Sequence, residues 1–157
     1  MKLTIWLAAA ITALFTVQSA KGQVQNDPAK KVELEKQFIE TLSGSTMVGT
    51  FTITGRGDDA KLRTERYTIT EVTKLQDNLF LFKARIQYGD RDVTVPLPLV
   101  VIWAGDTPVI TLTDAPIPGI GKYTARVMVY RDHYAGYWAG VDHGGHLFGT
   151  IERAKAQ

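Results

Sequence analysis

The sequence contains no cysteine, and this absence excludes a disulfide framework, a thiol nucleophile and lipid attachment through an N-terminal cysteine. Serine is scarce: beyond residue 22 only Ser43 and Ser45 occur, and neither stands at a strand-to-helix elbow that could present a nucleophile. No glycine-rich phosphate loop opens a helix, and neighbouring aspartates lie in turns, where Asp is expected for backbone reasons. The sequence therefore predicts no catalytic residue and no cofactor, and it favours a protein that is not an enzyme.

The balance of charge excludes a further class of partner. The chain has 18 Lys and Arg against 16 Asp and Glu, and Lys2 and Lys21 lie in the first 22 residues, which contain no acidic residue. Beyond residue 22 the two numbers are therefore 16 and 16. Because nucleic-acid binding depends on a basic surface, the balanced remainder of the chain predicts no nucleic-acid partner.

The N-terminus has the organisation of a secretory signal. Lys2 precedes an apolar run over residues 3–17, and small residues follow at Ala20 and Gly22. The run is short for a bilayer span, and small residues at this place are typical of a cleavage site. The sequence thus predicts a signal peptide over residues 1–22, a secreted or periplasmic protein, and no membrane span after cleavage. An uncleaved membrane anchor is the alternative.

Residues 23–44 are predicted to form a polar leader followed by one helix. Asp27 and Pro28 are typical of an N-cap and a first helical position, and Gly44 suits the left-handed residue after a helix. The side expected to dock on a sheet carries five residues, namely Val32, Glu35, Phe38, Ile39 and Leu42. Four of these are apolar, so we expect the helix to plug or cover the sheet that follows.

Residues 45–157 are predicted to form a β domain, because the apolar pattern changes to period two. The expected strands cover residues 46–54, 61–73, 79–88, 92–103, 108–114, 123–131, 134–141 and 146–153. In the second strand Tyr67 and Ile69 share a face that Val72 does not, which predicts a bulge near Thr70. Short connections favour an antiparallel meander that closes into an eight-stranded barrel. A two-sheet sandwich is the alternative.

Two prolines and one irregular connection modify this barrel. Pro96 and Pro98 stand two apart in one strand, which removes consecutive donors from one side of its ladder and predicts an edge or a seam there. Residues 115–121 are predicted to be an irregular apolar connection.

The last two strands are predicted to join through a Gly-rich loop at residues 142–145. This register pairs Val141 with His146 and sets Trp138 opposite Gly149. An indole can then lie flat over bare backbone, which suits a strongly curved sheet.

Aromatic side chains gather on the face that is predicted to point inward. Those expected to line a ligand site are Phe82, Tyr88, Trp103, Tyr123 and Trp138. Such rings, some with polar tips, suit a small hydrophobic ligand. A filled hydrophobic core is the alternative, since barrels of this size are commonly packed solid.

All three histidines lie between residues 133 and 146. Asp142, His143 and His146 are candidate ligands of a divalent metal ion, because imidazole and carboxylate groups are common metal ligands. A plain turn is the alternative, since a short His spacing beside glycines specifies a metal site only loosely.

A likeness to known sequences is carried by four segments: MVGTFTITG, ITEVTKL, ARIQYGDRDVTVPLPLVVIWAGDTPVITL and DHGGHLFG. They resemble a set of uncharacterised exported bacterial β-barrel proteins, over most of the chain beyond the signal. That resemblance implies the fold and export but no activity. In architecture alone the expected barrel is similar to the lipocalin and avidin superfamily, although Gly49-Thr50-Phe51 has Phe where the lipocalin signature has Trp.

The sequence favours three functions, in this order. The first is an exported, non-catalytic binding module that holds a small apolar ligand inside the barrel. The second is a solid-core envelope protein that binds a protein partner through its threonine-rich faces and its proline edge. The third is a metal-dependent enzyme that uses the histidine cluster.

Overall fold

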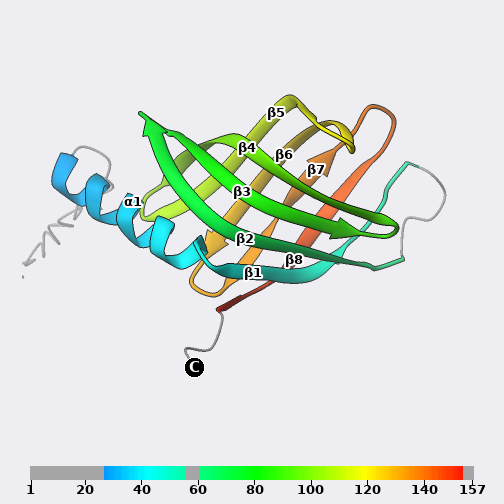
Figure 1. Cartoon of the computed structure of the whole chain (residues 1–157), viewed down its shortest axis with the longest axis horizontal. Helices are drawn as coiled ribbons and strands as arrows, with labels where there is room; N and C mark the ends of the chain where they lie inside the picture. Colours follow the sequence, from blue (N-terminus) through cyan, green and yellow to red (C-terminus); the bar gives the residue numbers. More distant parts are fainter. Residues whose placement is uncertain (1–26, 56–60, 154–157) are drawn as a thin grey trace, which may run out of the picture.

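The computed structural model describes residues 27–55 and 61–153 of the chain. Within these ranges it forms one helix and eight β-strands (Figure 1). Their bounds are α1 Pro28–Leu42, β1 Ser45–Phe51, β2 Arg63–Gln76, β3 Leu79–Tyr88, β4 Arg91–Ala104, β5 Thr107–Ile117, β6 Gly121–Tyr130, β7 His133–Ala139 and β8 Gly144–Arg153. The predicted signal peptide, residues 1–22, and the predicted leader up to residue 26 lie outside the described residues.

The eight strands form one closed antiparallel barrel, in which consecutive strands are neighbours. β1 also pairs with β8, from Ser45↔Arg153 to Phe51↔Leu147, and this ladder closes the barrel. Short connections allow consecutive strands only antiparallel pairing. The prediction of an all-β barrel with an N-terminal helix is confirmed, and the two-sheet sandwich is not formed.

Local signals define both ends of α1. The side chain of Asp27 accepts hydrogen bonds from the backbone N–H groups of Ala29, at 2.9 Å, and Lys30, at 3.4 Å. Pro28 occupies the first helical position. After the helix, Gly44 has a φ of +70°, a left-handed conformation that glycine adopts without a steric cost. The predicted start and end of the helix are confirmed.

α1 lies beside one end of the barrel (Figure 1). Its buried apolar side chains, Leu34, Phe38 and Leu42, follow a spacing of four residues. The predicted docking face was wrong in one position, since Val32 is 64% exposed and Leu34 is buried instead. The reason is geometric: at 3.6 residues per turn, Val32 projects to one side of the row that Leu34, Phe38 and Leu42 form against the barrel.

A polar contact fastens α1 to the barrel. The carboxylate of Glu35 is buried and forms an ion pair with Lys74 of β2. Lys31 lies 3.9 Å from the same carboxylate and donates a hydrogen bond of 2.9 Å to the side chain of Asn78, in the β2–β3 turn. Breaking a buried pair leaves a charge without compensation, so this contact holds the helix in one place.

Side chains alternate along each strand, and those on the inner face form the core. The buried apolar residues of the strands are Met47, Phe51, Ile69, Val72, Phe80, Phe82, Ala84, Ile86, Val95, Leu99, Val101, Val129, Tyr134, Leu147 and Ile151. The predicted bulge is confirmed, because the β2–β3 register shifts between Ile69 and Glu71. The extra residue returns Val72 to the inner face.

The β7–β8 turn is tighter than predicted. The N–H group of Gly140 donates to the carbonyl of His143 at 2.7 Å, so only Val141 and Asp142 form the tip. Ala139 therefore pairs with Gly144, and the predicted pairing of Val141 with His146 was wrong. The two registers differ by an even number of residues, so the same side chains still point inward.

The connection predicted over residues 115–121 is shorter than expected. Pro116 pairs with Lys122 and Ile117 with Gly121, so β5 continues beyond its predicted end. The N–H group of Ile120 donates to the carbonyl of Ile117 at 3.1 Å and closes the turn. A bulge between Leu112 and Ala115 lets β5 bend into this hairpin.

Candidate ligand site

The ladder between β4 and β5 covers only part of the two strands. It runs from Ala104↔Thr107 to Val100↔Thr111 and then ends, although β4 begins at Arg91 and β5 continues to Ile117. On the other side of β4 the ladder with β3 passes without interruption through Pro96 and Pro98. The donors that these prolines lack therefore face β5, and the predicted seam is confirmed.

The tip of the β5–β6 hairpin contacts the start of β4, beyond the seam. Nη1 of Arg91 donates to the carbonyl of Gly119 at 3.4 Å. A Cβ atom placed on Gly119 would lie 3.4 Å from Cγ1 of Val93. The wall of the barrel between β4 and β5 is thus held at its two ends by different contacts, with a stretch between them that has no ladder.

The inner face of the barrel is filled unevenly. Inward side chains of β1, β2, β3 and β8 are mostly buried. Those of β5, β6 and β7 that are only half-buried are Ile110, Leu112, Tyr123, Ala125, Val127 and Trp138. These inward side chains therefore remain partly accessible to solvent, unlike those of a closed core.

The five residues predicted to line a ligand site all lie on the inner face, where they form two groups. Phe82 and Trp103 contact the ring of Phe38 from α1, with centroids 6.0 and 6.1 Å away. Tyr88, Tyr123 and Trp138 lie at the opposite end of the barrel. The structure therefore does not bring all five residues into one site.

Aromatic rings form a continuous group at the end away from α1. Phe51 contacts Tyr88 and Trp138 edge-on, with centroids 6.0 and 5.9 Å away. Tyr123 lies 6.0 Å and the ring of His143 5.2 Å from Trp138. The Nε1 atom of Trp138 is buried and has no hydrogen-bond partner among the described residues. A buried indole donor without a partner is able to bind an acceptor on a ligand.

A buried carboxyl group stands beside these rings. Glu65 is 4% exposed, and its inward side chain is opposite Tyr88 in the β2–β3 ladder. Oε1 accepts a hydrogen bond of 2.9 Å from the hydroxyl of Tyr134, and Oε2 accepts one of 2.8 Å from the hydroxyl of Tyr67. Two neutral donors, rather than a cation, therefore satisfy this carboxylate.

Burial changes the ionisation of these groups. Desolvation raises the pKa of Glu65 to about 6, although the two tyrosine hydrogen bonds oppose the shift. Burial and the neighbouring carboxylate raise the pKa of Tyr67 and of Tyr134 well above the usual value. Burial and a hydrogen bond to Tyr123 raise the pKa of Tyr88 to about 12. Near neutral pH, Glu65 is the group in this cluster that changes its charge.

Glycines on two strands let Tyr134 reach Glu65. In the structure Tyr134, and not Trp138, lies opposite Gly149, and Gly149 is opposite Gly49 in the next ladder. A Cβ atom on Gly149 would lie 2.8 Å from Cε1 of Tyr134, and one on Gly49 would clash with its hydroxyl. The predicted packing of an aromatic ring over bare backbone is therefore present, with a different ring.

Sequence reasoning missed Glu65 and Tyr134 as site residues. A signal for Glu65 was available, because it stands two and four residues before Tyr67 and Ile69, on the face that was expected to point inward. A charged residue in that position is rarely buried without a partner, so it indicates a polar site. Tyr134 had no such signal, since its role depends on the register of β7 on β8.

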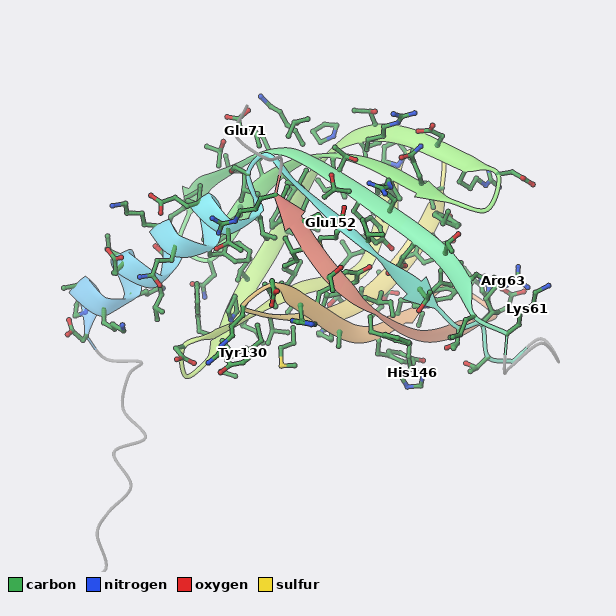
Figure 2. The ribbon with its side chains drawn as sticks, turned by 90° about the horizontal axis from the view of Figure 1, so that it is seen from below. Lys61, Arg63, Glu71, Tyr130, His146 and Glu152 are labelled. Carbon is green, nitrogen blue, oxygen red and sulfur yellow. The ribbon has the colours of Figure 1, made fainter. Side chains whose placement is uncertain are left out.

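The predicted metal ligands point in different directions. Nδ1 of His143 lies 2.6 Å from Oδ1 of Asp142, and the His143 ring packs on Trp138. His146 is exposed on the outside of β8, where its ring contacts Tyr137 (Figure 2). Within residues 27–55 and 61–153 no group of three His, Asp or Glu side chains is able to hold a metal ion.

A hollow lies between α1 and the rim of the barrel. It has a volume of about 210 Å³ and is lined by Phe38, Trp103, Val129 and Arg131, among others. Trp103 thus borders this cleft, at the far end of the barrel from Trp138.

No family model, curated protein or solved structure matches this chain. Among the residues that the structure describes, no helix is long and apolar enough to cross a membrane.

Proposed function

We propose that this chain is an exported, non-catalytic protein that binds a small, mainly apolar ligand inside its barrel. The observation that carries the proposal is the uneven interior: most inward side chains of β5, β6 and β7 keep accessible surface, while most of those of β3 are buried. Apolar and aromatic walls with a few polar groups are typical of small-molecule sites. Export rests on the signal-like pattern of residues 1–22.

The ligand would lie next to Trp138, between Leu112 and Tyr123. The seam between β4 and β5 supports entry through the wall, because separating strands that share no ladder breaks no backbone hydrogen bond. Tyr88 and Tyr123 lie at the end of the barrel away from α1, so their hydroxyls supply polar contacts there.

Binding is tested with N-phenyl-naphthylamine, a neutral apolar fluorophore, and the chain beyond residue 22. We expect its emission to rise on binding and the fluorescence of Trp138 to fall. Ala125 is opposite both Leu112 and Trp138 on the inner face. Ala125→Phe therefore places a ring where the ligand is proposed to bind, and it should abolish the fluorescence signal.

The matched control is Thr94→Phe, which adds the same ring to an exposed, outward position of β4. It should bind the fluorophore as the unmodified chain does. Far-UV circular dichroism shows whether both variants keep the barrel. Unchanged binding by a folded Ala125→Phe chain, or no binding by the unmodified chain, would contradict the proposal.

A second candidate function is supported by the outside of the barrel. The register places Ile102, Val109, Met128, Ala135 and Phe148 in one outward row across β4 to β8. Ile102, Met128 and Phe148 are each 45–47% exposed. Contiguous exposed apolar side chains are typical of a protein interface.

A second copy of the chain is the simplest partner for this row. Sedimentation of the unmodified chain and of Met128→Lys tests this candidate. A dimer that the lysine dissociates would support it, and a monomer in both cases would reject it.

A further inference from the structure

Two tyrosine hydroxyls hold the carboxylate of Glu65. Among the described residues no Lys, Arg or His side chain lies within ion-pair distance of it, and its partners are the hydroxyls of Tyr67 and Tyr134. Arg63, two residues earlier on β2, is half-buried on the same inner face, opposite Phe51, at the end of the barrel away from α1 (Figure 2). Buried charges in proteins are as a rule paired, so a carboxylate of this kind can accept a cation from outside the chain.

The carboxylate also keeps unused acceptor capacity. An ionised carboxyl group offers about four lone-pair positions on its two oxygens. Each oxygen of Glu65 accepts one hydrogen bond, from Tyr134 and Tyr67 respectively. Gly49 of β1 is opposite Glu65, and the ring of Tyr134 lies over Gly49 and Gly149. The remaining acceptor positions are therefore approached from the side of the half-buried Tyr67 and Tyr88.

Aromatic surface surrounds the approach to Glu65. Tyr67 and Tyr88 are half-buried and flank the carboxyl group from β2 and β3. Phe51 contacts both Tyr88 and Trp138. These contacts connect the rings beside Glu65 to the half-buried side chains of β6 and β7. The faces of aromatic rings attract cations, and the attraction grows where water is excluded.

We propose that the ligand is an organic cation, in which an ammonium group on an apolar body binds at Glu65 between Tyr67 and Tyr88. The apolar body lies against Trp138 and Tyr123, beside the half-buried inward side chains of β5, β6 and β7. The inference rests on the proposed function, since it names the class of ligand that the same interior binds. The negative charge of Glu65 favours a cation over an anion. The ion pair that a cation forms with it favours the cation over a neutral molecule.

The test compares three probes of one shape: naphthylmethylammonium, naphthylmethanol and naphthoate. Isothermal titration at pH 7.5 should show that the ammonium binds at least about tenfold more tightly than the alcohol, and that the carboxylate binds most weakly. Glu65→Gln keeps the shape of the side chain and removes its charge, so it should bind the ammonium and the alcohol equally. Glu152→Gln, an exposed position on β8, is the matched control and should leave all three affinities unchanged.

The dependence on pH is a second readout. The charged and titratable groups on the inner face beside Glu65 are Arg63 and Tyr67 on its own strand, Tyr88 on β3 and Tyr134 on β7. Burial raises the pKa of each of the three tyrosines. With a pKa of about 6, Glu65 loses its charge as the pH falls from 7.5 to 5, and the affinity for the ammonium should fall about tenfold. The Glu65→Gln variant should show no such fall. His143 and Arg91 are present in both chains, so they do not contribute to the difference between them.

The outcomes separate the two proposals. If the alcohol binds as tightly as the ammonium, or the carboxylate binds most tightly, the inference is overturned and the proposed function stands. If none of the three probes nor N-phenyl-naphthylamine binds, the proposed function fails as well. If Glu65→Gln is unfolded by circular dichroism, the pH dependence of the unmodified chain decides alone, and an affinity for the ammonium that is independent of pH overturns the inference.

Discussion

The two ends of the barrel are built from the same kinds of residue and differ in how they are closed. At one end α1 inserts Phe38 among Phe80, Phe82 and Trp103, with ring centroids 5.6 to 6.1 Å apart. At the other end Tyr88, Tyr123 and Trp138 close on one another and remain half-buried. The helix supplies a buried ring from outside the sheet, and at the opposite end the ring of His143 in the β7–β8 turn packs on Trp138.

Because of this difference, the helix end of the core is expected to contribute mainly to stability, and the opposite end to the proposed ligand binding. The buried rings of Phe38, Phe80 and Phe82 at the helix end make contacts that depend on shape, so removing their atoms leaves a cavity. At the other end, accessible surface and a buried carboxyl group lower the contribution to stability, and the proposed ligand binding rests on these two features. The two regions should therefore respond differently to the same kind of substitution.

The largest effect is expected from Phe38→Ala at the helix end. Removing the ring deletes contacts with three aromatic side chains and should lower the free energy of unfolding by about 4 kcal/mol. Urea denaturation followed by circular dichroism measures the change. Val32→Ala on the exposed face of the same helix should cost less than about 0.5 kcal/mol, and equal losses in the two variants would show that α1 does not close the core.

Two leucines of β4 give a matched pair. Leu99 is 9% exposed opposite Phe80, and Leu97 is half-buried opposite Phe82. Leu99→Ala should lower the free energy of unfolding by about 3 kcal/mol and Leu97→Ala by about 1 kcal/mol. The second loss is smaller because the side chain of Leu97 is only half-buried. Urea denaturation of both variants checks the ratio, and similar costs would mean that the interior is filled evenly.

Gly149→Ala tests the path of Tyr134 across the barrel. The added methyl group would lie 2.6 Å from the Cα atom of Gly49 and 2.8 Å from the Tyr134 ring, so the variant should lose about 2 to 3 kcal/mol. Gly140→Ala at the open end would meet the movable ring of His143 at 3.2 Å and should cost less than about 1 kcal/mol. Thermal unfolding of the two variants makes the comparison, and an unchanged Gly149→Ala chain would argue against this packing.

The smallest effect is expected from the ionisation of Glu65. Its pKa is about 6 in the folded chain against an ordinary value of 4.5, so the unfolded chain loses the proton first as the pH rises. The stability that this group contributes is complete below pH 4.5 and decreases up to about pH 6, by on the order of 2 kcal/mol.

Denaturation of the unmodified chain and of Glu65→Gln across this range isolates the effect. Glu71 and Asp92, whose pKa values are lowered by Lys83 and Arg85, are present in both chains and cancel in the difference. A difference in stability that does not change with pH would show that Glu65 is not buried in the folded chain.

The features that the sequence determined by itself are local. Asp27, Pro28 and Gly44 define the helix because capping and left-handed turns depend on single residues. The alternation of apolar residues along each strand predicted its inner face. Pro96 and Pro98 predicted the seam, because a proline lacks a backbone N–H donor wherever its strand lies. These signals act over a few residues, so no tertiary contact was needed to interpret them.

Tertiary structure alone decided the site. Tyr134 and Glu65 are 69 positions apart, and they meet only because the register of β7 on β8 and of β8 on β1 sets two glycines between them. The same register turns His143 toward Trp138 and His146 outward, which separates two residues that are close in sequence. Pairing across strands depends on turn lengths and on the closure of the whole barrel, and these act between distant segments that no local pattern relates.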